Sequence, residues 1–287
     1  MCTELPPQEL TDRAVLERPK GGVVSRRTAL LASAGLAGST VLTAAGALPA
    51  MADRRGRPGR RRRADLSYTL SEDFPAYTVG EEAVRRPGTS IAADGYYMQR
   101  WDIYEHTGTH VDAPAHFNPN GRYADELTAD ELMVSAVVID IARRAAADPD
   151  TVVTVADLRA HERRHGRIEE GSAVLMYSGW GAKVQDPAAY RGSDSAGVLH
   201  FPGFGADACE WLIRRRDISA LGVDTLSIDP GNSVDFATHK VLNGAERYGI
   251  ENLAQLGRIP PSGTRISVGV VPFEQGSGGP ARVLAAW

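Results

Sequence analysis

Ionisable side chains that bind metals gather in one short segment, HTGTHVDAPAHF, which begins at position 106. They are separated by four, two and four residues, all even numbers: His106, His110, Asp112 and His116. If the segment is extended, residues two apart share a face, so all four side chains would point the same way, and Gly108 would leave room between the first two histidines. Imidazole and carboxylate groups suit Zn²⁺ or Mn²⁺, and this set could hold one ion or bridge two. The segment therefore predicts a metal centre.

A second pair of potential ligands, His239 and Glu251, lies further along the chain, twelve residues apart. A lone histidine or glutamate is more often structural or solvated than a ligand. From the residues alone, both interpretations of this pair stay open.

The first segment matches the pattern HxGTHxDxPxHF and resembles the signature of the metal-dependent cyclase and kynurenine formamidase family, which includes isatin hydrolases. The resemblance continues through PGF at 202, GVDT at 222, DPG at 229, DF at 235 and ENL at 251, and it covers most of residues 65–273. It implies a single swivelling β/β/α domain of the α/β (α+β) class, commonly assembled as a homodimer or homotetramer.

The resemblance also implies a role for each site residue. His106, His110 and Asp112 look like ligands of a first divalent ion. Asp112 would bridge to a second ion, bound also by His239 and Glu251, and His116 looks like the catalytic acid/base. The implied cofactor is two divalent metal ions, with Zn²⁺ expected first and Mn²⁺ as the alternative.

Such a site predicts hydrolysis of a carbon–nitrogen bond other than a peptide bond in a small-molecule substrate. A metal-activated water would attack the carbonyl of an aryl formamide or a cyclic amide, and His116 would return a proton to the leaving nitrogen. Kynurenine formamidase-like activity is the leading hypothesis, with an isatin or other lactam hydrolase as its alternative. A non-hydrolytic cyclase, a dehydratase and a metal-binding protein remain as different classes.

Aromatic residues supply the candidate substrate contacts. Kynurenine formamidases carry a PxWPGD stretch where this chain reads PAYTVG from position 75, so Tyr77 replaces the tryptophan and the Pro-Gly-Asp is absent. Trp180 is the second candidate substrate contact. Other aromatic residues suit either such a pocket or the core: Tyr96, Tyr97 and Trp101.

The N-terminal region is typical of a targeting segment. Arg26 and Arg27 precede a weakly apolar run, and AMA at position 50 offers a small-residue cleavage site. We expect a twin-arginine signal peptide over 1–52, export to the periplasm or outside the cell, and an Arg-rich linker over 53–64. An uncleaved membrane anchor is the alternative. The remaining residues 65–287 carry 20 basic and 31 acidic side chains, which argues against a nucleic-acid partner.

Periodicity places strands at 134–141, 173–177, 218–228 and 266–271, and helices at 154–166 and 206–216. Three further features of residues 65–287 could suggest a function but lack the sequence context that such a function requires. HERRH at 161 has the zincin spacing, yet its charged surroundings indicate a solvated helix end. Cys209 is expected to be a buried structural thiol, and Gly276 to Gly279 a loop.

Overall fold

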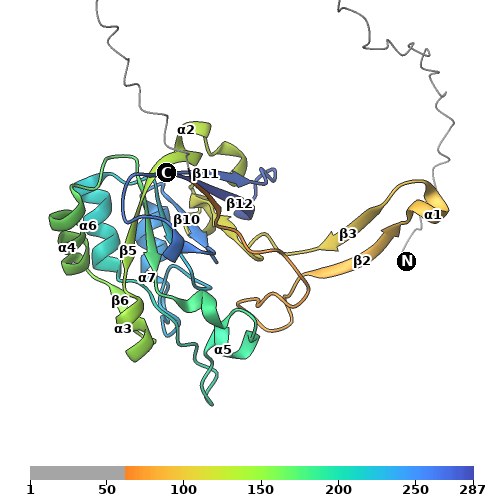
Figure 1. Ribbon diagram of the computed structural model, residues 1–287, viewed down its shortest axis with the longest axis horizontal. Helices are drawn as coiled ribbons and strands as arrows, with labels where there is room; N and C mark the ends of the chain where they lie inside the picture. The colour runs from red at the N-terminus through yellow and green to blue at the C-terminus, as the bar shows by residue number, and fades with distance from the viewer. Residues whose placement is uncertain (1–61) are drawn as a thin grey trace, which may run out of the picture. The chain divides into compact units, whose positions relative to one another are not determined.

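The computed structural model describes residues 62–287 (Figure 1). The predicted signal peptide at 1–52 and most of the predicted linker lie outside the described residues. The first strand begins at Arg63, where the register pairs it with Ala286. The last residues of the expected linker therefore belong to the folded domain.

A closed sheet forms the body of this domain. Its strands are β1 (Arg63–Asp65), β4 (His110–Asp112), β5 (Met133–Asp140), β7 (Ala173–Tyr177), β9 (Ala220–Val223), β10 (Tyr248–Glu251), β11 (Thr264–Val270) and β12 (Gly278–Ala286). Their order is β1-β12-β11-β5-β7-β9-β10-β4, and β4 pairs again with β12, so the sheet closes into a barrel. The neighbours β5, β7, β9 and β10 run parallel, and the remaining pairings are antiparallel.

Helices cover one side of this barrel (Figure 1). The longest are α4 (Val155–His165), α6 (Ala206–Arg216) and α7 (Ala237–Gly244). The shorter ones are α1 (Ile91–Asp94), α2 (Ala129–Leu132), α3 (Ala142–Ala147), α5 (Pro187–Arg191), η1 (Pro114–His116), η2 (Ala124–Glu126), η3 (Trp180–Lys183) and η4 (Leu256–Arg258). Together with the barrel they form one mixed α/β domain of the expected β/β/α type.

The apolar runs of the parallel strands are continuous because both faces of these strands are buried. In β5, Val134, Ala136 and Val138 pack into the barrel interior, whereas the alternate residues Val137 and Ile139 pack toward α4, α6 and α7. This explains why the period-two pattern of a half-buried strand is missing from the sequence.

Two strands stand outside the barrel. β2 (Val84–Thr89) and β3 (Met98–Asp102) pair only with each other, and α1 lies between them. In Figure 1 this hairpin, residues 84–102, projects away from the barrel; we call it the arm. The third small sheet joins β6 (Val152–Val153) to β8 (Gly203–Phe204).

Most predicted elements are confirmed, including α4 with its capping box between Thr154 and Asp157. The strand expected over 218–228 is wrong in extent, because β9 ends at Val223. The carboxylate of the next residue, Asp224, accepts hydrogen bonds from both the backbone N–H and the hydroxyl of Ser178. The chain therefore turns away from the sheet at this point. Within residues 62–287, no helix has the length and apolar character needed to cross a membrane.

Candidate metal centre and substrate cavity

The histidines of the 106–117 segment are brought together by turns of the chain, not by alternation along one extended strand. Only β4, His110 to Asp112, is extended; His106 precedes it in a turn and His116 ends the 3₁₀ helix η1. Gly108 lies in that turn with φ of 69°, and an added Cβ would sit 3.1 Å from the side chain of Leu70. The expectation of a single extended face is therefore wrong. Gly108 is needed for the turn, whereas the sequence suggested that it makes room between histidines.

Two carboxylates lie between two imidazoles at the bottom of the site. His110 Nε2 is 3.2 Å from Asp112 Oδ1 and 3.3 Å from Glu251 Oε2. His239 Nε2 is 3.6 Å from Asp112 Oδ2 and 3.3 Å from Glu251 Oε1. All four side chains are buried. Each carboxylate thus faces both histidines, each through a different oxygen.

Strand pairing brings these residues together from distant parts of the chain. In the antiparallel β4–β10 ladder, His110 stands directly opposite Glu251, so the two side chains share one face of the sheet. His239 comes from the first turn of α7, which begins beside the same ladder. The second pair, which the sequence left open, is therefore placed against the first segment.

Backbone and carboxylate partners fix the orientation of both buried imidazoles. Nδ1 of His110 donates to the carbonyl oxygen of Gly108 at 2.9 Å. Nδ1 of His239 donates to Asp229 Oδ2 at 2.7 Å, and Asp229 also accepts the backbone N–H of His239. In each ring Nε2 is left facing the carboxylates. A metal-ligating histidine is normally held in this way, through its other ring nitrogen.

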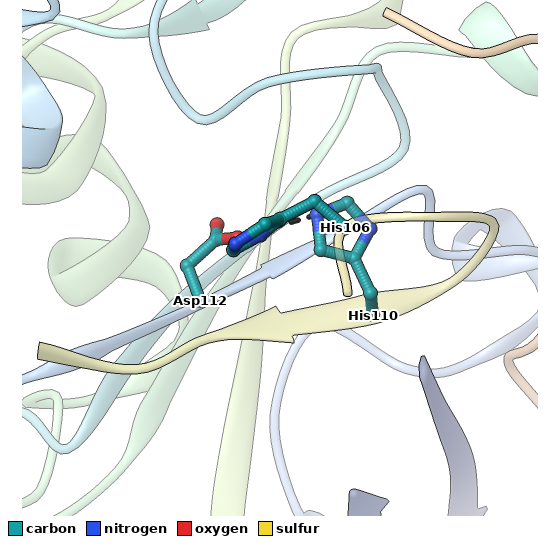
Figure 2. A group of neighbouring side chains, drawn as sticks. All are labelled: His106, His110 and Asp112. Atoms are coloured by element: carbon teal, nitrogen blue, oxygen red, sulfur yellow. Dashed lines mark hydrogen bonds and ion pairs between the residues drawn. The ribbon is translucent and has the colours of Figure 1, made fainter. Parts of the chain in front are cut away.

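The His106 ring has a polar partner at each of its two nitrogens. Its Nδ1 lies 2.7 Å from Asp112 Oδ1, and its Nε2 lies 2.9 Å from the hydroxyl of Ser277, which in turn donates to Glu105. Figure 2 shows His106 reaching over to the carboxylate of Asp112 beside His110. A Cβ on Gly278 would lie 2.7 Å from the His106 ring, so glycine is required there.

The Gly276 to Gly279 stretch, expected to be a simple loop, therefore has a structural role at the site, and its last two residues begin β12. Sequence reasoning missed Ser277, Glu105 and Asp229 as partners of the histidines. For Asp229 the available signal was its place in the DPG stretch at 229; for the other two there was none.

The buried carboxylates of Asp112 and Glu251 favour positive charge on the groups beside them. Burial lowers the pKa of His110, but Asp112 and Glu251 outweigh it and raise the pKa to about 10. Burial also opposes protonation of His239, yet Asp112, Asp229 and Glu251 raise its pKa well above the ordinary value. Burial raises the pKa of Asp112, but the adjacent histidines hold it well below its usual range. These shifts all favour positive charge beside the two carboxylates.

A divalent cation fits this donor set. His110 Nε2 and Asp112 Oδ2 are buried and complete no hydrogen bond of normal geometry among the described residues, although oppositely charged groups lie 3.2–3.6 Å away. Buried polar atoms in this condition are costly unless another group binds them. Two clusters of potential ligand atoms share Asp112, one formed with His106 and His110 and the other with His239 and Glu251. Imidazole and carboxylate donors suit divalent transition ions, and a bound cation would replace the protons.

His116 lies outside the buried set formed by His110, Asp112, His239 and Glu251. Its ring stacks on His106, with centroids 3.9 Å apart and an interplanar angle of 26°, and its centroid is 5.7 Å from that of His239. Burial lowers its pKa to about 4, against the opposing effect of Asp112. A neutral imidazole at this position can accept a proton near neutral pH.

A cavity of about 300 Å³ opens over the histidines and carboxylates. Its aromatic wall consists of Tyr77, Tyr104, Phe117 and Phe236. Phe236 adopts the left-handed backbone region with φ of 52°, and its ring lies 5.4 Å from Phe117 and 6.2 Å from Tyr77. No lysine or arginine is among the described residues that line the cavity. One wall of the cavity is therefore aromatic, and its floor carries the histidines and carboxylates.

The two substrate candidates are placed differently. Tyr77 lines the cavity, where burial together with Glu251 and Asp229 raises the pKa of its hydroxyl. Trp180 does not line it. Trp180 is buried beside Tyr190 and Phe201, and its indole N–H donates to the carbonyl oxygen of Tyr190 at 2.7 Å. Its role is packing.

The remaining sequence motifs do not join the site. His161 is buried on α4, so the helix is less solvated than expected. Glu162 binds Arg216 at 2.6 Å, and no third metal-binding side chain gathers with His161 and His165 in the described part of the chain. Cys209 is fully buried, and burial raises the pKa of its thiol, as expected for a structural cysteine.

Known proteins resemble the chain along most of this domain. The Cyclase family model ("Putative cyclase") matches residues 64–230. An isatin hydrolase from Roseibium aggregatum is 32% identical over 203 residues, which is 67% of this chain and 76% of that protein. A kynurenine formamidase from Geobacillus thermodenitrificans is 24% identical over 220 residues, 76% of this chain and 94% of that protein.

Among solved structures, isatin hydrolase A from Ralstonia solanacearum superposes with a TM-score of 0.75 at 34% identity. The match covers 79% of this chain and 92% of that one. The sequence match, the fold and the clustered histidines and carboxylates agree: this chain belongs to the Cyclase family, whose members include hydrolases of carbon–nitrogen bonds.

Proposed function

We propose that this protein is a metal-dependent hydrolase that opens a cyclic amide fused to an aromatic ring, as isatin hydrolases do. An aryl formamide, the type of substrate named for the kynurenine formamidases, is the second candidate. The observation that carries the proposal is the pair of buried atoms that complete no hydrogen bond of normal geometry, His110 Nε2 and Asp112 Oδ2, beneath an aromatic-walled cavity. Tyr77 stays as a proposed substrate contact.

The lining of the cavity favours the cyclic amide. N-formylkynurenine carries a charged amino-acid group remote from its formamide, and the described lining offers no lysine or arginine to bind the carboxylate of that group. A lactam such as isatin is flat and neutral, so it can lie against Tyr77, Phe117 and Phe236 without leaving a charge unpaired.

The proposed ligand set follows the two clusters. His106 Nδ1, His110 Nε2 and Asp112 would hold one divalent ion, and Asp112, His239 Nε2 and Glu251 a second, with Zn²⁺ or Mn²⁺ as the ions to test. A divalent ion in such a site polarises a carbonyl and lowers the pKa of water.

Residues of the chain itself would then bind the substrate and transfer the proton. The aromatic wall holds the ring of the substrate so that its amide carbonyl faces the carboxylates and histidines. His116, neutral because of burial, accepts a proton from the attacking water and delivers it to the amide nitrogen as the C–N bond breaks. Because the amide is cyclic, the product is a single ring-opened molecule that carries both a carboxylate and a free arylamine, and the remaining proton of the water is released to solvent.

The test uses the full chain, loaded separately with Zn²⁺ and Mn²⁺ and analysed for metal content. Isatin and N-formylkynurenine are then assayed side by side. Consumption of isatin with little action on N-formylkynurenine is expected. The reverse preference would make the chain an arylformamidase. Bound metal with neither substrate consumed would contradict hydrolysis of both and favour a non-hydrolytic cyclase, a dehydratase or a metal-binding protein.

A further inference from the structure

The cavity has a buried floor and an exposed mouth. The buried set of two histidines and two carboxylates lies at the floor, whereas Tyr77 is 37% exposed and Tyr104 is 62% exposed. Thr78 and Glu81 also line the cavity and are exposed. We call Tyr77, Thr78, Glu81 and Tyr104 the mouth. A substrate whose amide reaches the floor therefore carries its distal atoms past the mouth.

Glu81 supplies the carboxylate of the mouth. The other two carboxylates of the lining, Asp112 and Glu251, each face both buried histidines. Glu81, in contrast, forms no ion pair within the described structure, and the described lining contains no lysine or arginine. Its negative charge is therefore available to a cation that enters the cavity.

The turn that carries Glu81 is fixed by its neighbours. The backbone N–H of Glu81 donates to the carbonyl oxygen of Thr78 at 3.2 Å. Arg191 donates to the carbonyl oxygen of Ala76 at 3.3 Å, and its guanidinium lies 3.6 Å from the carboxylate of Glu82. One arginine thus holds the segment on both sides of Glu81. The same arginine neutralises Glu82, which does not line the cavity.

The arm brings Glu81 and Tyr104 to the same side of the mouth. The register pairs Val84, where β2 begins, with Asp102, where β3 ends. Glu81 precedes Val84 by three residues, and Tyr104 follows Asp102 by two. The two segments therefore leave the hairpin side by side, and both reach the lining of the cavity. A carboxylate and a phenol ring border the mouth together.

A carboxylate beside aromatic rings is an environment that binds an ammonium group. The face of an aromatic ring attracts a cation, and a carboxylate adds the opposite charge. We propose that the mouth selects substrates that carry a quaternary or protonated ammonium group remote from the amide, with Glu81 as the specificity-determining residue. Tyr77 and Tyr104 supply the rings. This inference rests on the proposed function, because it takes the amide to lie at the floor.

The charge of the whole domain acts in the same direction. Residues 65–287 carry 31 acidic and 20 basic side chains, so the field around the domain attracts cations and repels anions at long range. A substituent that is itself a carboxylate would meet Glu81 with no lysine or arginine of the described lining beside it. The mouth therefore discriminates by the sign of the charge on the substituent.

The first test measures binding and needs no turnover. The probe is benzyltrimethylammonium, which carries an aromatic ring and a permanent positive charge but no amide. Ligand-observed NMR titration of the full chain supplied with Zn²⁺ should detect binding, and Glu81→Gln should weaken it about 3- to 10-fold. The control Glu274→Gln, which removes an exposed glutamate outside the lining, should bind like the wild type. No binding by the wild type, or equal affinities of the wild type and Glu81→Gln, would overturn the proposal.

The second test compares two isatins substituted on the ring carbon para to the lactam nitrogen. One carries a trimethylammoniomethyl group and the other a neopentyl group, in which carbon replaces the charged nitrogen. In the wild type kcat/KM should be about 3- to 10-fold higher for the charged compound, and this ratio should fall toward one in Glu81→Gln. Raising NaCl from about 0.05 M to about 0.5 M should also lower the ratio, because salt screens exposed charges. A preference that survives Glu81→Gln would overturn the proposal.

The two tests separate this inference from the proposed function. Binding of the probe that depends on Glu81, with neither isatin consumed, would contradict lactam hydrolysis alone. Consumption of both isatins by the wild type with equal kcat/KM would contradict the ammonium site alone. The salt dependence distinguishes attraction between charges from a change in the shape of the mouth, which salt would not reverse.

Discussion

The ring of His116 lies flat against the ring of His106, with centroids 3.9 Å apart, while no hydrogen bond joins His116 to Asp112 or Glu251 in the described structure. Stacking places the His116 imidazole next to a proposed ligand without directing its nitrogens at the buried carboxylates. His116 is thus close to where a substrate carbonyl would lie and outside both clusters of potential ligand atoms.

His116→Ala is therefore expected to retain its metal and lose turnover. Positioned acid/base groups contribute roughly 10²- to 10⁴-fold, so kcat should fall by about that factor, while the metal content measured by mass spectrometry stays at the wild-type value. The matched variant His110→Ala should lose metal. Loss of metal from His116→Ala would make His116 a ligand.

Asp229→Asn tests the residue that orients His239. The carboxylate accepts the Nδ1 proton of His239 and two backbone N–H groups at the start of α7. An amide in its place supplies a weaker acceptor, so affinity for the metal should fall about 10- to 100-fold. Competition with a chromophoric chelator measures this change. Asp235→Asn, an exposed aspartate on the same segment, should bind metal like the wild type.

Phe236→Leu tests the aromatic wall. Aromatic pairs contribute about 0.5–1.5 kcal/mol beyond burial, so KM for an aromatic substrate should rise about 2- to 10-fold with little change in kcat. Phe273→Leu removes a partly exposed phenylalanine that does not line the cavity and should leave KM unchanged. A fall in kcat with unchanged KM would show that Phe236 acts on the reacting geometry and not on binding.

Asp224 gives a prediction for stability against pH. Burial raises its pKa to about 6, although hydrogen bonds from Ser178 and Gly179 oppose the rise. The folded state therefore holds this proton more tightly than the unfolded chain, and its contribution is full below pH 4 and lost as pH rises through 6. A rise of about two pH units corresponds to at most about 3 kcal/mol.

The corresponding experiment compares urea unfolding of the wild type and Asp224→Asn from pH 4 to pH 7. The wild type should lose roughly 1–3 kcal/mol relative to the variant across this range, whatever the offset between the two at pH 4. Parallel pH dependences of the two proteins would mean that Asp224 ionises normally.

Export is testable independently of the site. Replacing Arg26 and Arg27 with lysine preserves charge but removes the twin-arginine pair on which the expected signal peptide depends. We expect the variant to accumulate inside the cell while the wild type is recovered from the periplasm or the medium, as measured by fractionation and immunoblotting. Equal distribution of both proteins would contradict the predicted signal over 1–52.

The sequence predicted the elements whose patterns are local. The strand at 173–177 and the helix from Val155 to His165 depend on apolar runs and caps within a few residues. The path of the chain from His106 to His116 depends on long-range pairing: β4 is extended only where β10 and β12 pair with it. A period-two pattern could not reveal that the strand is three residues long.

At the site, too, local patterns were predictable from the sequence and long-range contacts were not. Types and spacing predicted His106, His110 and Asp112 as ligands and left His239 and Glu251 open, and the family resemblance then assigned the second pair to a metal. Ser277 escaped because it contacts His106 across 171 positions of sequence and has no distinguishing neighbours. Trp180 was assigned to the substrate because its type suits an aromatic pocket, yet burial beside Tyr190 decides its position.

Pairing of β4 on both edges has a consequence for ion selectivity. A strand held by β10 on one side and β12 on the other cannot shift without breaking two ladders, so His110 and Asp112 keep their spacing whether or not an ion is present. Calcium prefers six to eight oxygen ligands in a flexible cage. We therefore expect a rigid strand that presents imidazole beside carboxylate to discriminate against calcium in favour of smaller ions that accept nitrogen. The closure of the barrel would then contribute to the choice of ion together with the ligand types.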